Sequence, residues 1–164
     1  MLATDDSNDV FAFWGYHRQC GIHNRVEVVS DGEDALRYLA STKALPAVLI
    51  LSLNMPRIGG LKVLELLAGI HTKIPKVLLI DEKDQDVRLV AAAIKLGVEA
   101  FLMRPVVKAE FCSLMSRFRD TLMMDGCPQP GTSTSTRHQN RNSELPDQPG
   151  VTSESDGSQQ GRGQ

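Results

Sequence analysis

Residues 47–67 read AVLILSLNMPRIGGLKVLELL, and this stretch decides the fold class of the chain. Its first five residues, 47–51, form an unbroken apolar run, which is typical of a central strand covered on both faces. A polar turn follows, and Leu61, Leu64 and Leu67 then recur at helical spacing. The stretch therefore predicts one strand and one helix of a parallel sheet.

Four further apolar runs are separated from this unit and from one another by helical patterns. They predict strands at residues 1–4, 26–29, 76–80 and 99–103. Five units of a strand followed by a helix predict a doubly wound α/β sandwich with one parallel sheet.

The four other predicted helices each carry an apolar stripe. Ser30 or Asp31 is a candidate cap for the second helix, and Gly21 and Gly97 are candidate ends for the first and fourth. The stripe positions are Val10, Phe13, Trp14 and His17; Ala35, Leu36 and Leu39; Val87, Val90, Ala91 and Ile94; and Phe111, Leu114, Met115, Phe118 and Leu122.

Length and composition fit one domain followed by a polar tail. After Met124 the chain is rich in Gly, Pro, Ser, Thr and Gln and has almost no large apolar residue. We therefore expect a folded domain at residues 1–124 and a disordered, low-complexity tail at 125–164, because such a segment cannot offset its ordering entropy.

Charge, hydropathy and cysteine usage exclude several classes of protein. A net charge of −2 gives no global attraction to nucleic acid, and no apolar run is long enough for a membrane helix. The first residues carry no secretory signal, so we expect a cytoplasmic protein. Cys20, Cys112 and Cys127 fit neither a disulfide framework nor a zinc site, so we expect free thiols.

Polar residues follow the predicted strands where their carboxyl ends meet at one edge of the sheet. Ligands of open parallel sheets gather at this edge. The residues expected there are Asp5 and Asp6, Ser52 and Asn54, Asp81 and Glu82, and Arg104 and Pro105.

Four segments of the chain follow one another in this order: TDDSNDV, VEVVSDGEDALRYL, AVLILSLNMPRIGGLKVLELL and KLGVEAFLMRPV. Together they resemble the receiver domains of bacterial response regulators, the CheY-like superfamily. The resemblance covers roughly residues 1–122. It implies a flavodoxin-like (βα)5 fold with sheet order 2-1-3-4-5 and a role in two-component or phosphorelay signalling.

The resemblance also reveals departures at the phosphorylation site. The family's phosphoacceptor Asp matches Ser52, its switch Thr or Ser matches Ile80, and its Lys before Pro matches Arg104, while Phe101 matches the aromatic switch position. A neutral Ser hydroxyl needs a base before it can attack phosphorus. We therefore expect a degenerate receiver in which aspartyl phosphorylation no longer operates.

The acidic pair Asp5 and Asp6 would hold Mg²⁺ weakly at best, because the third carboxylate is absent. Arg104 is expected to act as a fixed counter-ion that bridges Asp5, Asp6 or Asp81, since an arginine fork can contact two carboxylates at once.

The function favoured by these features is a pseudo-receiver, without enzyme activity, that acts through protein contacts. Its partner would be a histidine kinase, another receiver or an output protein; self-association as a homodimer stays open. The first alternative is a response regulator phosphorylated at Ser52 or Asp81. A small flavodoxin-like enzyme or nucleotide binder is a weaker alternative, because no Gly-rich phosphate loop follows a strand.

Overall fold

Five parallel strands form one sheet at the centre of the protein. The computed structural model describes residues 1–70 and 73–124, so the predicted tail at 125–164 lies outside the described residues. Neighbouring strands are parallel and the order is β2-β1-β3-β4-β5, which confirms the predicted topology. The strands are β1 (Leu2–Ala3), β2 (Val28–Val29), β3 (Leu49–Ser52), β4 (Lys76–Ile80) and β5 (Val98–Met103).

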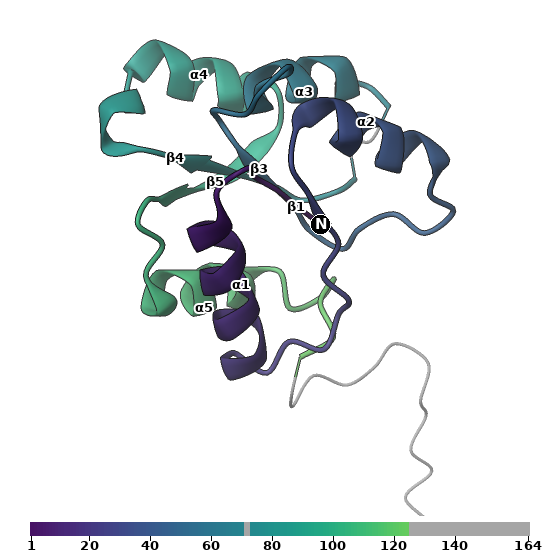
Figure 1. The fold of residues 1–164 in the computed structure, drawn as a ribbon, viewed down its shortest axis with the longest axis vertical. Helices are drawn as coiled ribbons and strands as arrows, with labels where there is room; N and C mark the ends of the chain where they lie inside the picture. The colour runs from purple at the N-terminus through teal and green to yellow at the C-terminus, as the bar shows by residue number, and fades with distance from the viewer. Residues whose placement is uncertain (71–72, 125–164) are drawn as a thin grey trace, which may run out of the picture. The chain divides into compact units, whose positions relative to one another are not determined.

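Helices cover both faces of this sheet. Figure 1 shows α1 and α5 on one face and α2, α3 and α4 on the other. None of the helices in the described ranges is long and apolar enough to cross a bilayer. The helices are α1 (Ser7–Gln19), α2 (Gly32–Ser41), α3 (Gly60–Leu67), α4 (Val87–Lys95) and α5 (Lys108–Arg117), and a 3-10 turn, η1, spans Glu82–Asp84.

The predicted helix boundaries follow from local backbone chemistry. Asp6 caps α1 by accepting from the Asn8 amide, and Asp31, rather than Ser30, caps α2. Gly97 has φ 85°, a left-handed conformation that follows the end of α4.

The core consists of one apolar cluster on each face of the sheet. On the α1 and α5 face, Phe13 and Phe111 meet edge to face with ring centroids 5.0 Å apart. All five residues of the last predicted stripe are buried, but α5 ends at Arg117, so Phe118 and Leu122 lie beyond the helix. The prediction for α1 is wrong at Trp14, which is 47% exposed, because Asp9 and Phe13 form the face that turns inward.

The apolar stripe predicted for α4 is mostly exposed. Val87 is 82% exposed and Ile94 57%, whereas Ala93 is buried. The helix carries apolar residues on two faces, and Leu89 and Ala93 pack against the sheet. Helical spacing alone cannot distinguish two apolar faces, and in the predicted stripe Val90 is partly buried whereas the other three residues are exposed.

The prediction of free thiols is wrong for two of the three cysteines. Cys20, at the end of α1, and Cys112, on α5, form a disulfide with their Cα atoms 5.5 Å apart. The pair is separated by 92 residues, and only the packing of α1 beside α5 brings it together. Cys127 lies outside the described residues.

Candidate functional site

The candidate site lies at the carboxyl edge of the sheet, where the ends of four strands bring polar residues together. Ser52 is the last residue of β3 and is fully buried. Thr4 follows β1, Asp81 follows β4 and Arg104 follows β5. The Arg104–Pro105 peptide bond is cis.

Arg104 is the centre of the site. Its Nε and Nη2 donate to Asp9 Oδ2 at 2.9 and 2.5 Å, and Nη2 also reaches Thr4 Oγ1 at 3.3 Å. The same Nη2 donates to Ser52 Oγ at 2.8 Å. The guanidinium therefore ties three segments of the chain to one another.

Asp9 is the carboxylate that neutralises Arg104. Its side chain is 6% exposed and that of Arg104 is 13% exposed, so the pair is well shielded from solvent. Thr4 Oγ1 donates a further hydrogen bond to Asp9 Oδ2 at 2.8 Å. Burial lowers the pKa of Arg104, but the hydrogen bond and charge of Asp9, with the charges of Asp81 and Asp6, raise that pKa above its ordinary value. Arg104 therefore remains charged.

Arg104 is a counter-ion, as expected, and of the three predicted carboxylates Asp81 pairs with it, but its closest partner, Asp9, was not predicted. Asp81 lies 3.8 Å from Nη1, which is an ion pair but too long for a hydrogen bond. Asp5 is exposed, and Asp6 uses Oδ1 to accept from the Asn8 amide at 2.8 Å. Asp9 lies outside the acidic pair, Asp5 and Asp6, that the sequence predicts at this edge. Its position four residues before the buried Phe13, on the inward face of α1, was the available signal.

Ser52 is bound on both sides. Its Oγ donates to the Asn54 carbonyl at 2.8 Å and accepts from Arg104 at 2.8 Å. Asn54 is exposed, and its Nδ2 donates to Asp84 Oδ2 at 2.7 Å. The hydroxyl is therefore occupied by a carbonyl and a cation, and neither can take its proton.

The remaining predicted site residues lie around this centre. Ile80, the last residue of β4, is buried, and Phe101 on β5 is partly buried. Asp81 also pairs with Lys83 at 3.7 Å, and Pro105 is exposed.

The donor set does not fit a magnesium site. Mg²⁺ needs several oxygen ligands in octahedral geometry. Ser52 supplies a neutral hydroxyl that already contacts a guanidinium, and the Asp6 carboxylate caps a helix. In the part of the chain that the structure describes, no three His, Cys, Asp or Glu side chains are grouped so that they could hold a metal ion.

A second ionic cluster fixes the loop between β3 and α3. Arg57 has φ 58°, a left-handed conformation uncommon for a residue with a side chain. It contacts the buried Asp31 at the start of α2, and also Glu33 at 2.9 Å and Asp34 at 3.3 Å. These contacts hold the loop that follows Ser52 against α2. Arg57 is not among the site residues that the sequence predicts.

Known proteins share this fold. The receiver domain family of response regulators matches residues 2–116. Transcriptional regulatory protein PrrA of Mycobacterium leprae is 28% identical over 134 residues, covering 81% of this chain and 54% of the relative. The Mycobacterium tuberculosis protein of that name is 29% identical over 127 residues, covering 77% and 51%. The chain thus spans about half the length of these relatives.

Solved structures of response regulators also resemble this chain. The bacteriophytochrome response regulator RtBRR superposes with a TM-score of 0.62 and 29% identity, covering 71% of this chain and 75% of that one. The bacteriophytochrome response regulator AtBRR has a TM-score of 0.60 and 29% identity, covering 71% and 89%. With the family match spanning most of the described residues, this chain belongs to the receiver domain family of two-component response regulators.

Proposed function

We propose that this chain is a pseudo-receiver that acts through protein contacts without aspartyl phosphorylation. The observation that carries the proposal is the state of Ser52: a buried, neutral hydroxyl stands at the end of β3 and is bonded to Arg104 and to the Asn54 carbonyl.

The chemistry of phosphoryl transfer supports this proposal. A carboxylate can attack phosphorus directly, whereas serine becomes a nucleophile only when an adjacent base removes its proton. Ser52 donates its proton to a backbone carbonyl, which is not a base. Arg104 cannot remove the Ser52 proton either, because a guanidinium donates hydrogen bonds and has no acceptor atom. The Asp9 carboxylate, in turn, is already bound to Arg104 and Thr4.

The switch that would report a phosphoryl group is altered as well. Ile80 ends β4 and has no hydroxyl to hydrogen-bond an incoming phosphate oxygen. Arg104 meanwhile is held by the protein's own Asp9 at 2.5 Å. We infer that the site is fixed in one state by its own residues.

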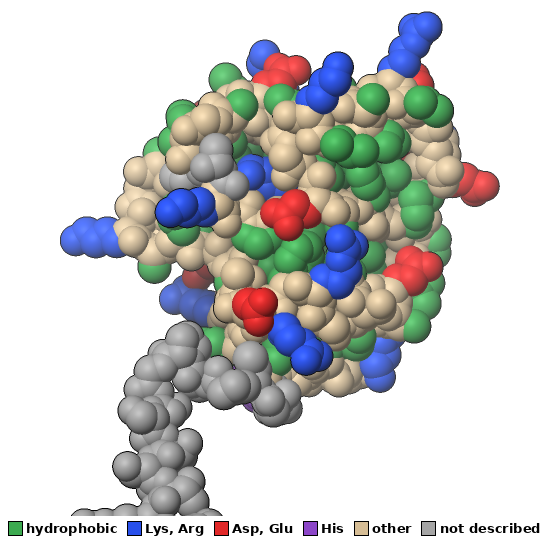
Figure 2. Space-filling view, turned by 180° about the vertical axis from the view of Figure 1, so that it is seen from behind, with side chains coloured by type: hydrophobic (Ala, Val, Ile, Leu, Met, Phe, Trp, Pro, Cys, Tyr) green, Lys and Arg blue, Asp and Glu red, His purple; other side chains and the backbone are tan. Residues whose placement is uncertain are grey.

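An exposed apolar face on α4 supports a role in protein binding. Val87 and Ile94 project from this helix with 82% and 57% of their surface exposed. Figure 2 shows hydrophobic side chains gathered on the side where α4 lies after the turn from Figure 1. Exposed apolar patches of monomers commonly mark interaction sites. A histidine kinase, another receiver or an output protein would be the partner.

Mass spectrometry of the intact protein after incubation with acetyl phosphate and Mg²⁺ tests the proposal. We expect no mass increase for the wild type. Ser52→Asp is the matched variant, since it restores the family's acceptor at the same position. A phosphoryl adduct on wild-type Ser52 or Asp81 would instead establish a working regulator with a non-standard acceptor.

A further inference from the structure

The last described residues of the chain are docked against the segment that follows α1. Ile22 and Met124 form an isolated antiparallel bridge. The His23 amide donates to the Met123 carbonyl at 2.7 Å, and the Met123 amide donates to Asn24 Oδ1 at 2.6 Å. The backbone at Met124 is therefore held beside Ile22.

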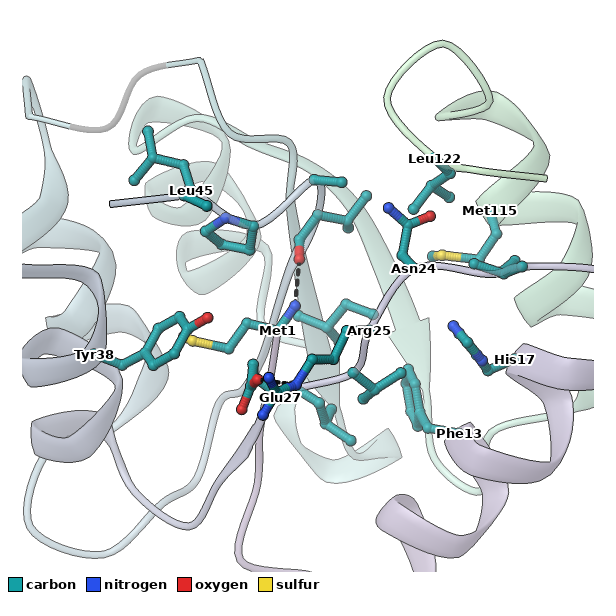
Figure 3. Close-up of a pocket in the computed structure, with 18 of the residues that line it drawn as sticks. Met1, Phe13, His17, Asn24, Arg25, Glu27, Tyr38, Leu45, Met115 and Leu122 are labelled. Carbon is teal, nitrogen blue, oxygen red and sulfur yellow. Dashed lines mark hydrogen bonds and ion pairs between the residues drawn. The ribbon is translucent and has the colours of Figure 1, made fainter. Parts of the chain in front are cut away.

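Apolar packing anchors the same stretch. Leu122 is buried in the core cluster on the α1 and α5 face of the sheet. Figure 3 shows Leu122 with Asn24, next to Met115 of α5 and His17 of α1. Packing and hydrogen bonds thus act together here, and none of these residues belongs to the site around Ser52.

The Cys20–Cys112 disulfide lies close to this docking point. Cys20 ends α1, and Gly21, with φ 67°, turns the chain into Ile22. Bridged residues have Cα atoms about 5 Å apart, and two residues of chain span at most about 7 Å, so the Cα atom of Met124 lies within about 12 Å of that of Cys20. Both bonded cysteines are partly exposed to solvent.

A third cysteine is attached to this docked stretch by a short length of chain. Cys127 follows Met124 by three residues in the sequence. Three residues of extended chain span about 10 Å, and a disulfide needs Cα atoms only about 5.5 Å apart. The covalent connection from Met124 is therefore long enough to bring the Cys127 sulfur to Cys20.

The charge near Cys112 makes it the better leaving group of the bonded pair. Lys108 stands four residues before Cys112 on α5, so the two side chains share one face of the helix. A nearby ammonium group favours a thiolate, and a thiol of lower pKa leaves a disulfide faster. Attack is thus expected at Cys20, with Cys112 departing.

We propose that Cys127 exchanges with the Cys20–Cys112 disulfide. The Cys127 thiolate attacks Cys20 Sγ and forms a Cys20–Cys127 bond. The bond to Cys112 breaks, and the Cys112 sulfur leaves with the electron pair as a thiolate. The step conserves electrons, so it needs no external oxidant or reductant. It moves the covalent link of α1 from α5 to the segment that follows Met124.

Mapping of the free thiol in the full chain tests this proposal. The oxidised protein is kept without reductant at about pH 8.5, the ordinary pKa of a cysteine thiol, and is then acidified. The monomer is isolated in acid, labelled with N-ethylmaleimide and digested for peptide mass spectrometry without reduction. We expect label at Cys112 as well as at Cys127, together with a Cys20–Cys127 peptide.

Two variants supply the controls. Cys127→Ser has no thiol to exchange and should leave Cys112 unlabelled. Adding Val151→Cys to Cys127→Ser keeps one thiol in the same tail but places it much further from Met124. The effective concentration of a tethered group falls as roughly the −3/2 power of tether length, so label at Cys112 should drop roughly tenfold or more.

The distribution of label in the wild type decides the outcome. Label confined to Cys127 would overturn the proposal, and so would label at Cys20 in place of Cys112, which would mean attack at the other sulfur. Label on all three cysteines would overturn it by showing that there is no disulfide to exchange. An undiminished share of Cys112 label in the Val151→Cys variant would do the same, because proximity of the third cysteine would then play no part.

Discussion

Replacement of Arg104 by Ala is expected to destabilise the protein strongly, because it leaves the Asp9 carboxylate buried without its cation. Asp9 is 6% exposed and receives two hydrogen bonds from Arg104, so after truncation only Thr4 would remain to solvate it. Breaking a buried pair by removing one partner costs about 3–5 kcal/mol. The variant also removes the donor to Ser52. Urea denaturation at pH 7.5, analysed by linear extrapolation, measures the loss.

A double-mutant cycle separates the pair from the rest of the site. Arg104→Ala, Asp9→Ala and the double variant should be non-additive, with a coupling of about 2 kcal/mol or more, because each single change leaves one charge buried. Arg37→Ala is the matched control: its side chain is 64% exposed and pairs with Glu33 and Asp34, so it should cost under about 1 kcal/mol. A loss for Arg104→Ala no larger than that for Arg37→Ala, or strict additivity with Asp9→Ala, would refute this reasoning.

Three further predictions address other parts of the fold. Reduction of the Cys20–Cys112 disulfide should lower the free energy of unfolding by about 4–5 kcal/mol, because the bond joins residues 92 apart in the sequence. Equal urea midpoints with and without a reductant would contradict a stabilising disulfide. Because burial lowers the pKa of His17 below 6.5, the unfolded chain binds a proton at this residue more readily than the folded protein does, so stability should fall as the pH drops below 6.5. His17→Phe should flatten this pH dependence of stability, and an unchanged profile in the variant would contradict the role of His17. Gly60→Ala would place a Cβ 2.3 Å from the last carbonyl oxygen of β3 and should lower the free energy of unfolding by about 1–3 kcal/mol. Gly15→Ala, inside α1 with space around it, should raise that free energy by about 0.5–1 kcal/mol. Similar thermal midpoints for the two variants would contradict the packing described.

The fold could be predicted from the sequence because its signals are local. The apolar run at 47–51 and the alternation of short runs with helical stripes identify five units, and the handedness of their connections leaves few arrangements. The burial of the last stripe was also predicted correctly, although α5 ends at Arg117, before Phe118 and Leu122. The face of α4 that packs against the sheet was not predicted, because its two apolar faces give the same periodic signal.

The position of the site was predictable, but its contacts were not. The parallel arrangement of the strands places Ser52 and Arg104 at one edge of the sheet, independently of the contacts that their side chains make. The choice of Asp9 as the partner of Arg104 depends on which face of α1 turns inward, and this is set by packing. The Cys20–Cys112 pair likewise depends on the docking of two helices far apart in sequence.

The binding of a phosphoryl mimic tests the central claim most directly. Amide NMR spectra of the wild-type chain would be recorded with Mg²⁺, before and after addition of beryllofluoride, with Ser52→Asp as the control that regains a carboxylate. We predict that the wild-type spectrum does not change, because Ser52 is neutral and bound to Arg104. Ser52→Asp should respond to Mg²⁺ more than to beryllofluoride, since Ile80 still provides no hydroxyl. Beryllofluoride-dependent shifts in the wild type, centred on Ser52, Asp81 and Arg104, would contradict the account.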